Sequence, residues 1–181
     1  MLHHDLESLR AAARSGARLK YLLFWGHTAA GAELGKECLS QWYPAELVVD
    51  GHRFPTAEHY MMFRKAKLFG DDAAAERILE APNASAVKAI GRAVRGFKDS
   101  VWEQHRFSIV VEGNYAKFTQ SASLNAFLSS TKKRILVEAS PVDRIWGIGL
   151  AADDPHVENP LEWRGLNLLG FALMDVRARL E

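Results

Sequence analysis

The chain has 181 residues, of which 48% are hydrophobic and 25% are charged, a composition typical of a soluble globular protein with a substantial core. A formal net charge of +1 gives no global electrostatic case for binding nucleic acid or a membrane surface. No run approaches the roughly 20 apolar residues of a membrane helix, and the N-terminus lacks the apolar core of a signal peptide. The single cysteine, Cys38, excludes an internal disulfide and fits a reducing compartment, so we expect a cytoplasmic protein.

The first third of the chain predicts a helix, a strand and a hairpin. Residues 5–14 have the spacing of a short, mostly polar amphipathic helix, which we interpret as an appendage. The apolar run 21–25 is typical of a buried strand. Residues 45–54 alternate as paired strands do, and Asp50-Gly51 between them is a strong hairpin turn signal.

The middle of the chain is predominantly helical. Pro55-Thr56 indicates the start of a helix that runs to about Gly70. Ser85 is expected to cap a later helix, because its hydroxyl can accept a hydrogen bond from the first turn. The other helical patterns span 71–80, 86–92, 98–120 and 124–128.

The C-terminal part combines a strand, a long loop and a closing helix. Residues 134–140 are the clearest later strand. A glycine-, proline- and acid-rich loop over 146–167 follows. Residues 168–180 have amphipathic helical spacing, and Asn167 is placed to cap that helix.

Helices outnumber strands in this pattern, and no repeat, low-complexity tract or linker interrupts it. We therefore expect an α+β fold, helix-dominated with a few short strands. Residues 21–181 are expected to form a single domain, and residues 1–20 a helical extension to it. The sequence specifies no oligomeric state.

A carboxylate and an amine share the apolar face of the helix that follows Thr56. Glu58 and Lys65 fall with Met62 and Phe69 within a stripe about 60° wide. Burying either charge is costly unless it is paired or solvated, so a structural salt bridge or a half-buried face would explain the pattern. A pocket would explain it as well, with Glu58 as a general base or a stabiliser of positive charge and Lys65 as a nucleophilic amine.

Two glycine-containing loops are candidate ligand sites. The segment DRIWGIG, residues 143–149, follows a predicted strand, and RGLNLLG, residues 164–170, opens the last helix. Glycine lets the backbone approach a ligand, and N–H groups at such places bind anions. Taken alone, each loop is better explained by a turn followed by a helix cap. The chain also has five tryptophans, most of which must be core, although one or two suit stacking on a base or sugar.

Six motifs together are far more specific than any of these signals. In chain order they are LSQWYP, DGHRFPTAEHYMMFRKA, GRAVRGFKDSVW, KFTQ, LVEASPVDRIWGIG and GLNLLGFALMDVR. They resemble, in register from about Tyr21 to the C-terminus, the motifs of the YbiA-like family, also called NADAR for its association with NAD and ADP-ribose metabolism. Gln41 stands where the family usually has Asn, and Met62 where many members have Gln. Both departures bear on substrate preference.

The resemblance implies an N-glycosidase that cuts the bond between the anomeric carbon of ribose and a base nitrogen. The substrates it implies are phosphoribosylamino-pyrimidine intermediates of riboflavin synthesis, or ADP-ribose attached to a base, guanine in nucleic acid being the notable case. The expected partner is therefore a nucleotide-like molecule with an ADP-ribose or phosphoribosyl moiety, and ADP-ribosylated nucleic acid would be a further one. No metal or redox cofactor is implied. His3-His4, the only close histidine pair, is not interpreted as a metal site.

The resemblance also assigns roles to residues. Glu58, which matches the family's Glu, would stabilise positive charge on the ribose, and Lys65 would attack the anomeric carbon of a ring-opened sugar. Asp143 would orient a ribose hydroxyl or water, with a loop-capping role as the alternative. His59 points away from Glu58 and is interpreted as packing or hydrogen-bonding support. The expected substrate-binding residues are Trp25, Ser40, Arg92, Trp102, Lys117, Trp146, Gly147, Gly149, Asn167 and Gly170.

Structural alternatives accompany several of these assignments. Core packing is an equal alternative for Trp102 and Trp146, and a surface salt bridge is the alternative for Arg92. A competing function is a module that binds ADP-ribose without cleaving it. The presence of Glu58 and Lys65 together argues against that function, because binding alone needs neither reactive group.

Overall fold

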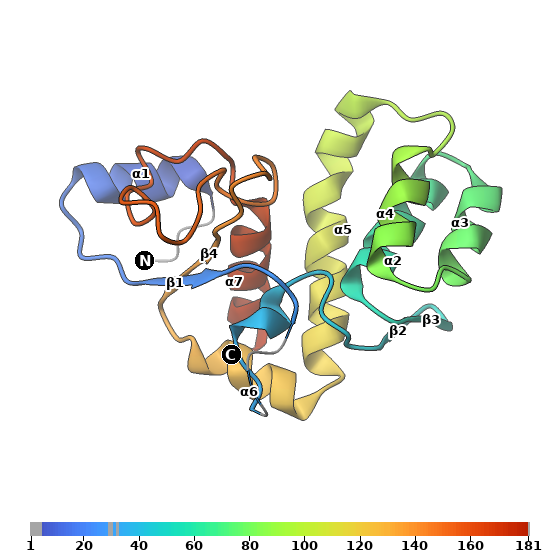
Figure 1. Cartoon of the computed structure of the whole chain (residues 1–181), viewed down its shortest axis with the longest axis horizontal. Helices are drawn as coiled ribbons and strands as arrows, with labels where there is room; N and C mark the ends of the chain where they lie inside the picture. Colours follow the sequence, from blue (N-terminus) through green and yellow to red (C-terminus); the bar gives the residue numbers. More distant parts are fainter. Residues whose placement is uncertain (1–4, 29–30, 32, 181) are drawn as a thin grey trace. The chain divides into compact units, whose positions relative to one another are not determined.

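The computed structural model describes residues 5–28, 31 and 33–180, and the chain divides into two compact units (Figure 1). The first unit combines the chain up to Ser40 with the chain from Ser123 onward, and the second is Gln41–Ala122. The described residues form seven α-helices, one 3₁₀ helix and four short strands. The predicted class, a helix-dominated α+β fold, is confirmed.

A two-stranded parallel sheet lies at the core of the first unit. Strand β1 (Tyr21–Phe24) pairs with β4 (Ile135–Glu138) along their full lengths. Helix α7 (Leu168–Leu180) packs on β4 and buries most of its first two turns. The 3₁₀ helix η1 (Lys36–Leu39) contacts β1. Helix α6 (Ala122–Ser130) precedes β4 in the chain and confirms the helix predicted there.

The side chain of Asn167 fastens helix α7 to strand β4. Its Nδ2 donates to the carbonyl of Leu136 at 2.9 Å, and its Oδ1 accepts from the N–H of Glu138 at 3.0 Å. The prediction that this side chain caps α7 is therefore wrong, because both of its amide groups are used by the strand. Gly170 completes the contact, since a Cβ there would lie 2.1 Å from the carbonyl oxygen of Leu136.

Replacing Asn167 with Ala is expected to lower the free energy of unfolding by about 2–3 kcal/mol, because one buried and one partly buried hydrogen bond are lost and Ala disfavours the left-handed backbone at this position. Urea unfolding followed by circular dichroism measures the change. Asn159→Ala is the matched control, because Asn159 is an exposed loop residue. Equal losses in the two variants would contradict the fastening role.

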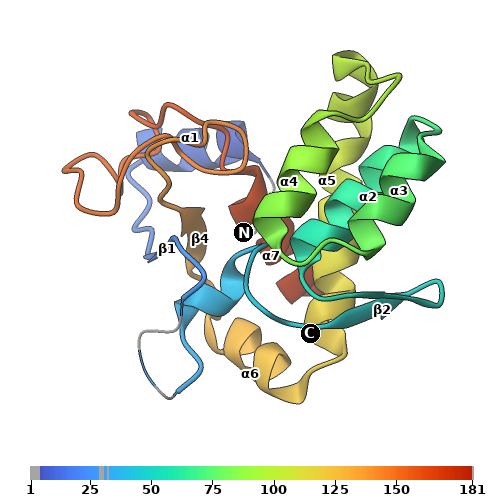
Figure 2. The ribbon, with the colours of Figure 1, turned by 45° about the vertical axis from the view of Figure 1, so that its right-hand side comes forward.

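Helix α1 (Leu6–Arg14) is an integral part of the first unit. Asp5 caps it and forms a capping box with Ser8. Leu9 is fully buried, and Arg10 donates from Nε to the carbonyl of Pro160 at 3.1 Å. The helix thus packs beside the long loop that precedes α7 (Figures 1 and 2), and the division into a 1–20 extension and a 21–181 domain stays a prediction.

A tight hairpin opens the second unit. Strands β2 (Leu47–Val49) and β3 (His52–Phe54) pair in antiparallel register. Asp50 and Gly51 have φ values of 51° and 78°, as the predicted two-residue turn requires. The side chain of Gln120 donates to the carbonyl of Val48 and accepts from its N–H, both at 2.8 Å, which fixes the hairpin to the end of helix α5 (Asp99–Thr119).

Four helices form the rest of the second unit. They are α2 (Ala57–Leu68), α3 (Asp72–Leu79), α4 (Ala84–Arg92) and α5 (Asp99–Thr119). Helix α2 is central and packs against the other three (Figure 2). Its central position explains why its first turns are buried on every side rather than along one stripe.

Side chains cap three of these helices. The predicted cap by Thr56 at α2 is confirmed, and Asp71 caps α3. The predicted cap by Ser85 at α4 is wrong, because Asn83 accepts the hydrogen bond from the N–H of Ala86 at 2.9 Å. Asn caps a helix as well as Ser does, so the local sequence contained two possible cap residues, two positions apart. None of the described helices has the length and apolarity to cross a membrane.

Candidate active site

Glu58 lies buried at the start of helix α2. Glu58 is only 4% exposed, so its predicted burial is confirmed. Its backbone N–H is one of the helix-end groups that need a partner outside the helix, and it donates to the carbonyl of Gln41 at 3.0 Å. The position in the first turn places the carboxylate near the positive end of the helix dipole, which favours its ionised form.

Lys65 lies two turns later on α2 and is half-buried. Its Nζ donates to the carbonyl of Gly91 at 2.8 Å and lies 4.2 Å from the ring centroid of Phe97 and 5.5 Å from that of Trp102. Burial lowers the pKa of the Lys65 amine, and the charges of Asp99 and Glu58 oppose the shift. A lowered pKa leaves more of the amine unprotonated near neutral pH, as a nucleophile requires.

Close packing of α4 on α2 brings the Gly91 carbonyl to Lys65. A Cβ at position 91 would lie 2.0 Å from the sulfur and 2.8 Å from Cγ of Met62, so any larger residue there would force the Met62 side chain to move. Trp102, on α5, is buried beside the amine. It therefore packs in the core and also forms part of the surroundings of Lys65. Arg92 follows Gly91 and is exposed. The structure thus brings Glu58, Lys65 and Trp102 together.

His59 supports the start of α2. It is buried, its Nδ1 lies 2.8 Å from Oγ1 of Thr56, and its Nε2 lies 3.2 Å from the carbonyl oxygen of Ala81. Burial lowers the pKa of His59, while the Ala81 carbonyl acts in the opposite direction. The predicted hydrogen-bonding support is confirmed.

Two fully buried polar side chains, those of Asn114 and Lys117, lie on α5. Asn114 donates from Nδ2 to Oε1 of Gln41 at 2.7 Å and so connects α5 to the residue that receives the N–H of Glu58. The substrate-binding role of Lys117 stays a prediction. Its side chain is fully buried, and its amine lies 5.2 Å from the ring centroid of Phe118 and 5.6 Å from that of Tyr43.

In the first unit, Asp143 forms a turn with its own loop. Its Oδ1 accepts from the N–H groups of Ile145 and Trp146, both at 2.8 Å. This contact supports the loop-capping alternative for Asp143, whose role towards substrate stays a prediction. Trp146 is half-buried next to the turn.

Packing explains the two glycines that follow. A Cβ at Gly147 would lie 2.9 Å from the carbonyl oxygen of Glu138, and Gly149 has a φ of 69°. Both glycines are buried, and packing is enough to explain them. The substrate contacts expected of them remain predictions. The same holds for Asn167 and Gly170, which hold α7 on β4.

Two predicted residues of the first unit lie nearer the surface. Trp25 is 56% exposed, immediately after β1, and is therefore available for stacking rather than used in the core. Ser40 is half-buried at the end of η1. Their roles in substrate binding stay predictions.

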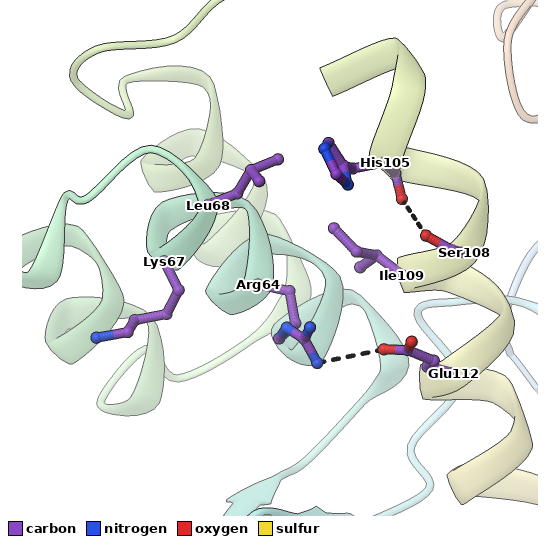
Figure 3. Close-up of a pocket in the computed structure, with 7 residues that line it drawn as sticks. All are labelled: Arg64, Lys67, Leu68, His105, Ser108, Ile109 and Glu112. Carbon is purple, nitrogen blue, oxygen red and sulfur yellow. Dashed lines mark hydrogen bonds and ion pairs between the residues drawn. The ribbon is translucent and has the colours of Figure 1, made fainter. Parts of the chain in front are cut away.

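A groove of about 370 Å³ lies between α2 and α5 (Figure 3). Arg64 and Glu112 form an ion pair of 3.3 Å across it. The groove is lined by Arg64, Lys67, Leu68, His105, Ser108, Ile109 and Glu112. Neither Glu58 nor Lys65 lines it, because the lining residues of α2 belong to the helix face that carries its solvated charges.

Within the described ranges, no group of three or more His, Cys, Asp or Glu side chains has an arrangement that could hold a metal ion. The pair His3-His4 lies outside those ranges.

The second unit therefore presents a buried carboxylate and a half-buried amine of lowered pKa on one central helix, an arrangement typical of an enzyme active site. The model of the NADAR domain family matches residues 23–181. The chain belongs to the NADAR family, as the six sequence motifs predicted.

Curated relatives support the same assignment. N-glycosidase R617 of Acanthamoeba polyphaga mimivirus is 41% identical over 163 residues, covering 87% of this chain and 95% of that protein. N-glycosidase YbiA of Escherichia coli strain K12 is 32% identical over 132 residues, covering 73% of this chain and 74% of that protein. The riboflavin biosynthesis protein VVA0006 of Vibrio vulnificus is 30% identical over 143 residues, which cover 79% of this chain and 35% of that protein.

A solved structure shares the fold. The NMR structure of Escherichia coli YbiA matches with a TM-score of 0.71 and 27% sequence identity, covering 89% of this chain and 84% of the other. The chain is thus a member of a family of enzymes that act on N-glycosyl bonds.

Proposed function

We propose that this protein hydrolyses the bond between ribose and a base nitrogen in an ADP-ribosyl or phosphoribosyl compound, with Glu58 and Lys65 as its reacting groups. The observation that carries the proposal is the Lys65 amine, half-buried and of lowered pKa, on the same helix as the buried Glu58. The relatives named N-glycosidases support the reaction class.

The reaction begins when the ring oxygen of the ribose takes a proton and its bond to the anomeric carbon breaks, which leaves a hydroxyl and an iminium between the anomeric carbon and the base nitrogen. The unprotonated amine of Lys65 adds to that carbon, and the bond to the base then breaks. The base leaves with a proton, so a Schiff base joins Lys65 to the sugar. Water adds to the Schiff base, releases the ribosyl product and restores the amine.

Glu58 assists this sequence in two ways. Its ionised carboxylate stabilises the positive charge that develops at the anomeric carbon, an effect that a buried position strengthens. It also carries protons between the ribose hydroxyl, the Lys65 nitrogen and water. Asp99, which lies on α5 rather than on α2 with Glu58, contributes a further negative charge near Lys65.

Two substrate classes fit this chemistry. One is ADP-ribose attached to a base, guanine above all, and the other is an aminopyrimidine ribotide of riboflavin synthesis. The name of the Vibrio relative favours the second class, although its aligned part is about a third of that protein. A base that is free, single-stranded or flipped suits the near-neutral charge of the chain better than extensive duplex contact does.

Incubation with each substrate tests the proposal. Wild-type protein is expected to release guanine from ADP-ribosylated guanosine or the free pyrimidine from the ribotide, as measured by chromatography of the reaction mixture. The substrate with the higher kcat/KM defines the class. Binding of both compounds with release of neither base would establish the non-catalytic binding module instead.

A further inference from the structure

The loop between α4 and α5 covers the Lys65 amine. Phe97 belongs to this loop, and its ring centroid lies 4.2 Å from Nζ of Lys65 and 5.2 Å from the ring centroid of Phe69, which it meets edge-on. Phe97 itself is 41% exposed, so its ring lies between the amine and the surface of the protein. An exposed phenylalanine needs an anchor to remain in one place.

An ion pair anchors the same loop. The guanidinium of Arg95 donates to Oδ1 of Asp71 from Nη2 at 2.7 Å and from Nε at 3.2 Å, and the backbone N–H of Arg95 donates to Oδ2 at 2.8 Å. Asp71 is buried, whereas the Arg95 side chain is 76% exposed. These hydrogen bonds hold the pKa of the Asp71 carboxyl well below its usual range, so it stays ionised at neutral pH.

Only Gly96 separates the anchored residue from Phe97. Its φ of 71° reverses the chain, and a Cβ there would lie 3.3 Å from the carbonyl oxygen of Phe69. Because a single residue lies between them, fixing the backbone of Arg95 restricts where the Phe97 ring can lie. Asp71 is itself fixed, because its Oδ1 also accepts from the N–H of Ala74 as the cap of α3.

We propose that Asp71 and Arg95 form a positioning latch that holds Phe97 over the amine of Lys65 and excludes water from it. The latch residues do not touch the reacting groups and act through Phe97. The inference rests on the proposed function only for the role of the amine. The contacts of Asp71, Arg95 and Phe97 are observed in the second unit and do not depend on the reaction. Neither residue stood out in the sequence.

Arg95→Ala tests the latch, because it removes the guanidinium and leaves Asp71 the hydrogen bonds from the backbone N–H groups of residues 95 and 74. Competitive acylation of all lysines with acetic anhydride, followed by peptide mass spectrometry between about pH 6 and 10, gives the pH midpoint of Lys65 reactivity. Loss of the latch admits water to the amine, so the midpoint is expected to rise towards that of an ordinary lysine. A rise of half a unit to one unit lowers the unprotonated fraction near neutral pH about three- to ten-fold.

The two charges that act on the Lys65 pKa remain in place in this experiment. Asp99 on α5 and Glu58 on α2 act on the charge of Lys65 in wild type and variant alike. Lys67→Ala is the matched control, because Lys67 is an exposed cation on α2 that pairs with Asp72, next to Asp71. Its Lys65 midpoint is expected to equal that of the wild type, and Arg95→Lys, which keeps the charge, is expected to restore part of the shift.

Two further outcomes separate the possibilities. An unchanged Lys65 midpoint in Arg95→Ala and Phe97→Ala alike would overturn the latch, and so would equal shifts in Arg95→Ala and Lys67→Ala. The labelling needs no substrate, so it remains readable if the wild type releases no base. A wild-type protein that releases no base would count against the proposed function alone.

Discussion

Replacing Lys65 with Ala is expected to reduce kcat/KM about 10³-fold or more, because the variant has no amine to form the Schiff base. Addition of borohydride during turnover should trap a sugar adduct on the wild-type protein, located at Lys65 by mass spectrometry. The same treatment of Lys65→Ala should leave the protein unlabelled. Release of base, followed by chromatography, measures the loss of activity in parallel.

The pH dependence provides an internal check on the Lys65 prediction. Burial lowers the pKa of the amine, and only the unprotonated amine attacks. The kcat/KM is therefore expected to rise with pH and to level off below the ordinary lysine value of about 10.4. Lys67→Ala, an exposed cation on the same helix, is expected to keep wild-type activity and trapping. Absence of a trapped adduct on an active wild-type enzyme would reject covalent catalysis by Lys65.

Replacing Glu58 with Gln is expected to lower kcat about 10²- to 10³-fold, roughly 3–4 kcal/mol of transition-state stabilisation. Gln keeps the size and hydrogen-bonding capacity of the side chain but removes the negative charge that stabilises the developing cation. KM should change little, because that charge acts mainly in the transition state. Steady-state kinetics on the better substrate measures both constants.

Thermal unfolding separates a catalytic loss at Glu58 from a folding defect. Gln is close in shape to Glu, so the melting temperature of Glu58→Gln should stay near that of the wild type. Glu76→Gln, an exposed carboxylate on α3, is the control and should keep full activity. A Glu58→Gln enzyme that retains wild-type kcat would remove the carboxylate from the mechanism.

Local chemistry made several elements predictable. Asp50-Gly51 defined the hairpin, because both residues accept the positive φ values that a two-residue turn demands. Thr56 marked the start of α2 for a similarly local reason, since its hydroxyl accepts from the N–H of His59. The start of α4 was misplaced because Asn83 and Ser85 are both competent caps, and the helix begins at the first of them.

The candidate site was only partly predictable. Helical periodicity placed Glu58 and Lys65 on one face, and their burial agrees with that face. It missed the pairing of Asp71 with Arg95 and that of Gln41 with Asn114, because each pair joins residues distant in sequence. An asparagine within the apolar spacing of α5 was the one available signal, and it carries no information about its partner.

The sequence by itself determined the turns, most helix starts, the family and the presence of an acid and an amine on one helix, because these follow from residues a few positions apart or from motifs in fixed order. Only the tertiary structure decided what surrounds the amine. The Gly91 carbonyl, the Phe97 ring and the Trp102 ring reach Lys65 from other segments of the second unit, and packing brought them there. The pKa of an amine depends on that packing, because desolvation is set by whatever atoms exclude water from it.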